Sequence, residues 1–148
     1  MTASHLDLIL PNLRERDRFE ILNASRYQTL AAWAKSRVEA PGVSWALLVN
    51  GVPVWCGGVL DGAVEGIGAL WLVGTQEAGR YAKHVLRVWK VIREVGGYRR
   101  LECKCYADNL TANRFAQRVG FRLEGTLKGY GLGGEDLNQY GIGGQHGR

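Results

Sequence analysis

The segment from residue 66 to residue 106 constrains the fold most, because it places a helix pattern between two strand patterns. Apolar residues recur at three- and four-residue steps over 77–95, and basic residues share the opposite face. Apolar strand-like runs flank this helix at 66–73 and 99–107. A strand, a helix and a second strand in succession form a parallel crossover. We therefore predict a sheet that contains at least one parallel pair.

The remaining pattern predicts further helices and strands. Asn50-Gly51 separates the apolar runs 43–49 and 52–60, which is a hairpin signal. We expect helices at 13–23, 27–39 and 110–119, and final strands near 121–131 and 137–142. This order predicts an α+β fold with a mixed, mostly antiparallel sheet of about six or seven strands flanked by helices, in a single domain over residues 1–148.

The first two predicted helices each carry an apolar stripe. We expect the core-facing residues to be Leu13, Phe19 and Leu22 in the first, and Leu30, Ala31, Ala34 and Val38 in the second. Pro41 ends the second helix, because the residue before a proline is disfavoured in helical conformation.

Composition and length restrict the class of protein. Hydrophobic residues make up 46 % and charged residues 22 %, which is typical of a globular domain. No apolar run reaches the about 18 residues of a membrane span. The start "MTASHLDLILPNLRERD" lacks the charged segment and long apolar run of a signal peptide, so we expect a cytoplasmic protein with no membrane partner.

The three cysteines, Cys56, Cys103 and Cys105, are expected to be free thiols in a reducing compartment. Cys103 and Cys105 stand two apart in a predicted strand and share one face. That spacing is not typical of a zinc site, so no metal is expected.

Basic charge is concentrated in one part of the chain. The net charge is +5, but the segment from Arg80 to Lys128 holds 12 Lys or Arg against 4 Asp or Glu. Such a segment can attract nucleic acid, an acidic protein or a phosphate-rich cofactor, and it can also be a solvated helix face. Aromatic residues are not interleaved with the basic ones, so nucleic-acid binding is not expected.

A motif in the second half of the chain carries a family resemblance. In "ADNLTANRFAQRVGFRLEGTLKGY", Asn109 is followed by a small residue, Ala112, and then by Gly120-Phe121. This spacing resembles the Gcn5-related N-acetyltransferases. "FRLEGTLKGY" and "GGEDLNQYGI" resemble the branch that acetylates the N-termini of ribosomal proteins. The close resemblance covers about residues 99–142, and the first half of the chain matches in element order.

The resemblance implies an acetyltransferase that uses acetyl-CoA as co-substrate. An amine would attack the thioester directly, which needs a base, N–H groups that polarise the carbonyl and an acid for the leaving thiolate. The acceptor would be a small molecule, or the N-terminus or a lysine of a protein.

The resemblance also assigns coenzyme-binding residues. The diphosphate would lie at Gln76-x-x-Gly79, where the start of the long helix offers N–H groups and a positive dipole end. Tyr81 stands where the family has Gly or Ala, and Glu77 adds a negative charge that Arg80 and Lys83 offset. The residues implied in coenzyme binding are Val73, Gln76, Gly79, Arg80, Asn109, Ala112 and Phe115.

The catalytic candidates are Glu65 as base, Tyr130 as acid and Asn109 at the reaction centre. The position where the family commonly has a tyrosine acid is Ala116, so Tyr106 is a second substitute, and Glu102 is a second candidate base. Each has a structural alternative: Asn109 can simply cap a helix, and the carboxylates can be surface charges.

Two functions stay open at this point. The first is the N-acetyltransferase. The second is a catalytically degenerate protein of the same fold that acts as a binding or structural module, because compact phage-encoded proteins that resemble this family, some of them virion-associated, have similarly altered coenzyme loops. Five tryptophans in a small domain leave room for an apolar surface that pairs two copies as a homodimer.

Overall fold

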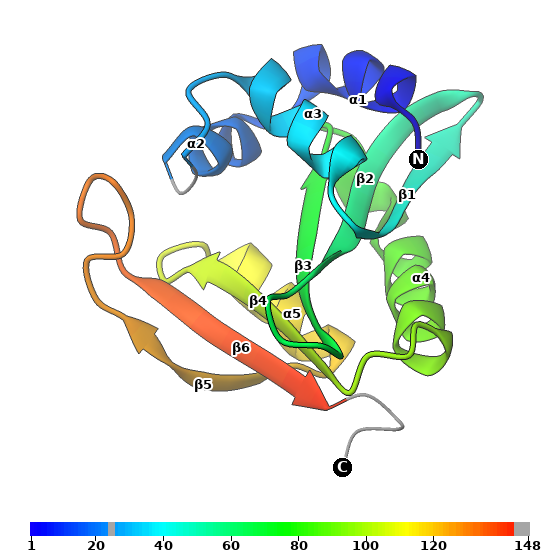
Figure 1. The fold of residues 1–148 in the computed structure, drawn as a ribbon. Helices are drawn as coiled ribbons and strands as arrows, with labels where there is room; N and C mark the ends of the chain where they lie inside the picture. The colour runs from blue at the N-terminus through cyan, green and yellow to red at the C-terminus, as the bar shows by residue number, and fades with distance from the viewer. Residues whose placement is uncertain (24–25, 144–148) are drawn as a thin grey trace. The chain divides into compact units, whose positions relative to one another are not determined.

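The structure is a computed structural model that describes residues 1–23 and 26–143. Within them, the chain forms the helices and strands labelled in Figure 1. Six strands form one mostly antiparallel sheet, which confirms the predicted α+β class, and their order is β1-β2-β3-β4-β6-β5. The elements are α1 (Ala3–Ile9), η1 (Leu10–Asn12), α2 (Glu15–Asn23), α3 (Leu30–Glu39), β1 (Gly42–Val49), β2 (Val52–Asp61), β3 (Ile67–Gly74), η2 (Ala78–Tyr81), α4 (Ala82–Val95), β4 (Arg100–Tyr106), α5 (Leu110–Val119), β5 (Arg122–Leu127) and β6 (Leu137–Gly143). The chain forms two compact units, residues 1–60 with 71–85 and residues 61–70 with the chain from 86 onward.

In the first unit, β1 and β2 form the predicted hairpin. They pair antiparallel from Gly42–Leu60 to Val49–Val52, and the turn between them has positive φ at both Asn50 (51°) and Gly51 (78°). Two successive left-handed residues make the turn whose twist matches that of the strands. The Asn-Gly signal was therefore sufficient to locate this hairpin.

The core of the first unit includes a helix that the sequence pattern did not predict. Leu6 and Ile9 of α1 are 1 % and 0 % exposed, and they lie in one cluster with Trp33, Cys56 and Val73. The segment is short and its start carries few periodic apolar residues, so the pattern was too weak to identify α1.

The predicted buried faces of the next two helices are partly wrong. In α2, Phe19 and Leu22 are 45 % and 37 % exposed, whereas Asp17 and Ile21 are buried. In α3, Val38 is 38 % exposed, and the buried residues are Trp33 and Ala34. Asp17 lies on the buried face of α2 because its carboxylate accepts from Gly74 of β3. The periodicity of apolar residues cannot show such a contact.

In the second unit, the first residues of β3 pair in parallel with β4, from Ile67–Arg100 to Ala69–Glu102. This confirms the predicted parallel pair. β4 pairs antiparallel with β6 over its whole length, and β6 pairs with β5 across a register shift at Leu123–Gly125. Because of this shift, Glu124 and Gly125 form a bulge in β5.

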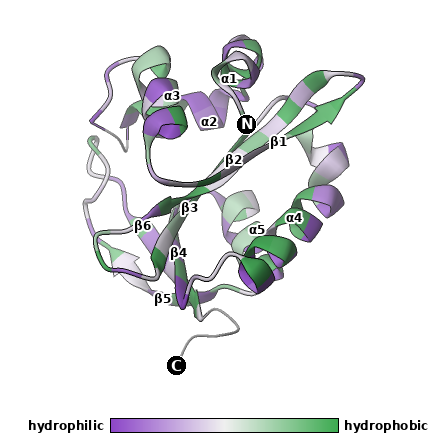
Figure 2. Cartoon of the chain, turned by 45° about the vertical axis from the view of Figure 1, so that its right-hand side comes forward, coloured by the Kyte–Doolittle hydropathy of each residue, from purple (hydrophilic) through white to green (hydrophobic). Residues whose placement is uncertain are grey.

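Helices α4 and α5 bury apolar residues on the faces that their sequence periodicity predicts. Trp89 and Ile92 of α4 and Ala116 of α5 are buried, and Figure 2 shows hydrophobic and hydrophilic residues in turn along α4. Gly120 ends α5 with a φ of 110°, which a glycine adopts without strain. None of the described helices is long and apolar enough to cross a membrane.

Strand β5 is shorter than predicted. It ends at Leu127, not near residue 131, because Gly129 has a positive φ of 63° and donates its backbone N–H to the Asp136 carboxylate at 3.0 Å. Lys128 forms an ion pair with the same carboxylate, at 3.0 Å. These contacts close a turn before β6.

Candidate active site

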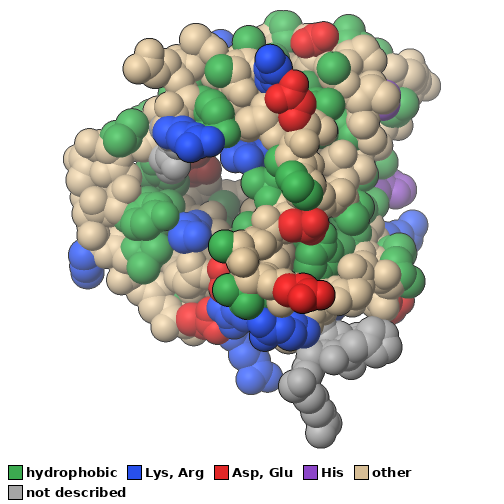
Figure 3. Space-filling view, viewed as in Figure 1, with side chains coloured by type: hydrophobic (Ala, Val, Ile, Leu, Met, Phe, Trp, Pro, Cys, Tyr) green, Lys and Arg blue, Asp and Glu red, His purple; other side chains and the backbone are tan. Residues whose placement is uncertain are grey.

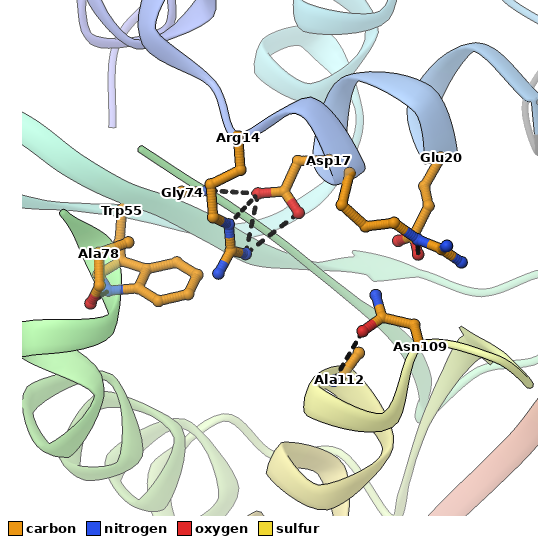
Figure 4. Close-up of polar contacts among 9 residues, drawn as sticks. Arg14, Asp17, Glu20, Trp55, Gly74, Ala78, Asn109 and Ala112 are labelled. Atoms are coloured by element: carbon orange, nitrogen blue, oxygen red, sulfur yellow. Dashed lines mark hydrogen bonds and ion pairs between the residues drawn. The ribbon is translucent and has the colours of Figure 1, made fainter. Parts of the chain in front are cut away.

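In the first unit, residues 13–17, which lead into α2, form hydrogen bonds to the last residues of β3. The Gly74 carbonyl accepts from the Arg14 backbone N–H at 3.1 Å, and the Gly74 N–H donates to Asp17 Oδ2 at 2.8 Å. Leu13 also forms an antiparallel bridge with Thr75. Figure 4 shows Arg14 and Asp17 converging on Gly74. The residues that follow β3 therefore begin from a fixed position.

Asp17 is a buried carboxylate in a bidentate ion pair. Its side chain accepts from Arg14 Nε at 3.0 Å and Arg14 Nη2 at 2.9 Å, and only 8 % of the residue is exposed. Burial raises the pKa of Asp17, while the Arg14 charge and the Gly74 N–H act in the opposite direction. The buried carboxylate thus forms hydrogen bonds to Arg14 and to Gly74 of β3 in place of hydrogen bonds to water.

Trp55 fixes the turn after β3 from a second direction. Its indole N–H donates to the Ala78 carbonyl at 2.7 Å, and the Arg14 guanidinium lies 4.7 Å from the centre of its ring. A Cβ on Gly74 would come within 2.7 Å of the Ala78 Cβ and 2.8 Å of the Trp55 ring. Arg14, Asp17 and Trp55 carry little signal in the sequence. An acid three residues after an arginine is usually a surface pair, so it does not indicate this site.

The predicted diphosphate segment follows directly and is open to solvent. Gln76, Gly79 and Arg80 are exposed, and η2 leads into α4. A Cβ on Gly79 would have none of the described atoms within 4 Å. A helix start offers N–H groups that lack partners within the helix, and the positive end of its dipole. The N–H groups of Ala78 and Arg80 already donate to the carbonyls of Thr75 and Glu77, at 3.0 and 3.1 Å. The segment therefore offers an anionic group open space at Gly79 and the exposed Arg80 side chain.

The other predicted residues of this unit are less open. Val73 is buried in β3, so only its backbone could contact a ligand. The Tyr81 ring lies 6.3 Å from that of His84, at the end of η2, and Tyr81 is partly exposed.

In the second unit, Asn109 stands at the junction of β4 and α5. Its Oδ1 accepts from the Ala112 N–H at 3.1 Å, so the capping role is confirmed (Figure 4). Ala112 and Phe115 are partly exposed along the same helix. The structure thus brings Asn109 and Ala112 together at the start of α5.

Asn113, which the sequence analysis did not identify, fixes this junction to β6. Its buried amide donates to the carbonyls of Tyr106 at 2.9 Å and Asn109 at 2.7 Å. Its Oδ1 accepts from Asn138 Nδ2 at 2.8 Å and from the Tyr140 hydroxyl at 2.7 Å. An amide can make four such bonds, and all four are made here.

The predicted base, Glu65, does not lie beside Asn109. Glu65 is exposed just before β3, and its carbonyl accepts from Arg99 Nε at 3.3 Å, next to the first residue of β4. Asn109 follows the last residue of β4. A strand of that length separates the two by about 20 Å, at roughly 3.3 Å per residue.

The remaining candidates lie in different environments. Tyr130 is 53 % exposed, with the Lys104 ammonium 5.9 Å from its ring centre, and Tyr106 is buried at 3 %. Glu102 pairs with Arg100 at 2.9 Å, and Arg100 also pairs with Glu124. Figure 3 shows acidic and basic side chains side by side near the lower end of the sheet. Among the described residues, there is no group of three or more metal-ligating side chains.

Comparison with known proteins gives matches to solved structures. No family model matches the chain. No curated protein sequence matches it. RimL, an α-N-acetyltransferase of a ribosomal protein solved with coenzyme A in a disulfide with one of its cysteines, has a TM-score of 0.71 and 18 % identity over 97 % of this chain and 90 % of its own.

Two further structures agree over nearly the whole chain. A ribosomal-protein-alanine N-acetyltransferase from Brucella melitensis has a TM-score of 0.74 and 19 % identity, over 97 % of this chain and 96 % of its own. The yncA protein from Salmonella typhimurium, solved with its cofactor acetyl-CoA, has a TM-score of 0.75 and 14 % identity, over 100 % and 93 %. This chain therefore has the fold of the Gcn5-related N-acetyltransferases.

Proposed function

We propose that this chain is an acetyl-CoA-dependent N-acetyltransferase that transfers the acetyl group to a primary amine by direct attack. The observation that carries the proposal is the open helix start at Gly79, directly after a strand end that Arg14, Asp17 and Trp55 hold in place. The shared fold supports it, because two of the similar structures contain coenzyme A or acetyl-CoA.

The residues that the resemblance implies in coenzyme binding are divided between the two units. In the first unit, Gln76, Gly79 and Arg80 would hold the diphosphate through N–H groups and a guanidinium, and the Val73 backbone would lie along the thioester end. In the second, Asn109, Ala112 and Phe115 would line the pantetheine arm. The bound coenzyme supplies an acetyl group activated as a thioester.

The chain's own contribution would be to orient the groups and to transfer protons. Tyr130, exposed and near the Lys104 ammonium, is the proposed donor of the proton that the leaving sulfur takes up. Glu65 is not part of this arrangement, because it lies at the other end of β4 from Asn109. The acceptor amine would lose its proton to solvent or to a group on the acceptor side. The acceptor is proposed as a small amine, or the N-terminus or a lysine of a protein.

A specific observation favours a second candidate, a non-catalytic binding module of the same fold. Tyr81 is bulky where the family keeps a small residue, Glu77 places a negative charge beside the loop, and Ala116 replaces the common tyrosine acid. A chain with these changes would keep the fold and bind a partner without turnover.

Calorimetric titration with acetyl-CoA separates the two candidates. We expect micromolar binding to the wild-type chain and at least about tenfold weaker binding to Gly79→Glu, because a carboxylate there repels the diphosphate. The matched control is Gly125→Glu, since a Cβ on Gly125 also has none of the described atoms within 4 Å but lies on β5. Acetyl transfer is then measured as thiol release with a panel of amines. No binding up to millimolar acetyl-CoA would overturn the enzyme and support the binding module.

A further inference from the structure

Arg37, in the last turn of α3, is stacked on two tryptophans of the first unit. Its guanidinium carbon lies 5.3 Å from the centre of the Trp33 ring and 6.0 Å from that of the Trp71 ring. The two indoles meet edge to face, with their centres 5.5 Å apart. A cation is attracted to the electron-rich faces of such rings, so these contacts restrict where the guanidinium can lie.

The charge of Arg37 has no carboxylate partner among the described residues. Arg14 and Arg16 of the same unit also lie over aromatic rings, but each pairs with a carboxylate, Asp17 at 2.9 Å and Glu20 at 2.7 Å. Burial lowers the pKa of Arg37, and no carboxylate acts against this effect. A partly buried charge without a counter-charge is costly, so an anion that reached Arg37 would be stabilised there.

The hydrogen-bond donors of Arg37 also lack partners. Its Nε is buried and has no acceptor. The terminal nitrogens Nη1 and Nη2 form no hydrogen bond with a described residue either, but they are not buried, and the residue is partly exposed. The two terminal nitrogens thus present a fork at the surface, and a planar carboxylate matches such a fork with two parallel hydrogen bonds.

The ring beside this fork determines which carboxylate fits. Trp33 is 3 % exposed and lies in the core, whereas Trp71 of β3 is partly exposed, so the accessible surface next to Arg37 is an indole. We propose that Arg37 and Trp71 form a binding site for a carboxylate that carries an apolar or aromatic group. A small aromatic acid and the C-terminal carboxylate of a peptide share this chemistry. Neither residue belongs to the proposed coenzyme site, so the inference does not depend on the proposed function.

Arg37 also has a structural role that needs no ligand. It stands in the last turn of α3, where the negative end of the helix dipole favours a cation. A lysine at this position keeps the charge and the apolar stem but loses the planar fork. Arg37→Lys should therefore leave the thermal midpoint of unfolding nearly unchanged and still weaken carboxylate binding, which separates the two roles.

Titration of the purified chain with benzoate, followed through the indole N–H signals in NMR spectra, tests the site. We expect the Trp71 signal, assigned by comparison with Trp71→Phe, to move to saturation with a dissociation constant of about a millimolar. The signal of Trp89, which is buried in the second unit, should not move. Benzamide has the same ring without the charge and should leave both signals in place.

Variants assign the binding to the guanidinium. Arg37→Lys should bind benzoate at least about fivefold more weakly, because it loses the two parallel bonds. Arg37→Met, which keeps the apolar stem without the charge, should not bind it. The matched control is Arg16→Lys, since Arg16 already has its own carboxylate, and binding should be unchanged. Tighter binding of N-acetylphenylalanine than of benzoate would identify the ligand as a peptide C-terminus, and the reverse order would identify it as a small acid.

Three results would overturn the inference. They are a Trp71 signal that does not saturate up to about 50 mM benzoate, an equal movement with benzamide, and unchanged benzoate binding in Arg37→Lys. The titration is made without coenzyme, so such a result would leave the proposed acetyltransferase function unaffected.

Discussion

A polar side chain of this chain contributes most to the fold where it bonds to a residue that is distant in the sequence. Two acid–base pairs on α2 show the difference. Asp17 pairs with Arg14 and also accepts from Gly74 of β3, whereas Glu20 pairs with Arg16 at 2.7 Å on a more exposed surface (Figure 4). The two pairs look alike in the sequence, but only the first connects α2 to the sheet.

The first prediction compares these pairs. Asp17→Ala should lower the free energy of unfolding by about 2–4 kcal/mol, because it leaves the Gly74 N–H and the Arg14 charge without their buried acceptor. Glu20→Ala should cost less than about 1 kcal/mol, because this pair is partly exposed and holds no group of another strand. Urea unfolding of both variants measures the difference. Equal losses would show that Asp17 does not hold β3.

The second prediction concerns pH and Tyr98. Its hydroxyl donates to Asp61 at 2.7 Å, and burial, followed by this bond, raises the pKa of Tyr98 to about 12. A pKa that is raised in the folded state contributes stability below the ordinary value of about 10, and this contribution is lost as the pH rises toward about 12. Tyr98→Phe should therefore flatten the fall in urea midpoint over this window. The exposed Tyr130→Phe serves as the control and should leave the profile unchanged.

At the scale of elements, local signals located the β1–β2 turn and both ends of α5, but not α1 or the end of β5. Asn50-Gly51 made the β1–β2 turn, and Asn109 and Gly120 began and ended α5 where the motif placed them. These signals succeed because capping and positive φ depend on a few consecutive residues. The buried faces of α2 and α3 were predicted less well, because they depend on what packs against them.

The third prediction concerns the junction between β3 and η2. Gly74→Ala should lower the free energy of unfolding by about 1–3 kcal/mol, since its Cβ would lie 2.7 Å from the Ala78 Cβ and 2.8 Å from the Trp55 ring. Gly79→Ala is the matched control, with open space at its Cβ, and should be neutral or slightly stabilising. Thermal unfolding compares the two. A neutral Gly74→Ala would mean that this junction relaxes readily.

At the scale of the whole molecule, the three thiols report on different parts of the structure. Cys56 lies in the core of the first unit, and burial raises its pKa to about 12. Cys103 and Cys105 are partly exposed in the second unit. Reactivity toward a small thiol reagent should therefore distinguish local access from unfolding.

The fourth prediction uses this contrast. In native buffer, an alkylating reagent should modify Cys103 and Cys105 before Cys56, and Cys56 should react only in urea concentrations that unfold the chain, because Cys56 is 0 % exposed. Peptide mass mapping over a urea series assigns each thiol. Rapid modification of Cys56 without urea would indicate local opening of the first core.

The sequence by itself determined the order of most elements, the α+β class, the parallel pair and the cap of α5 at Asn109. Periodicity and turn residues are local properties, so a linear chain displays them directly. Only the tertiary structure placed Asp17 on Gly74, connected Asn113 to β6 and separated Glu65 from Asn109. These depend on which distant groups meet at a strand end, and a buried polar group adopts whichever position satisfies its hydrogen bonds.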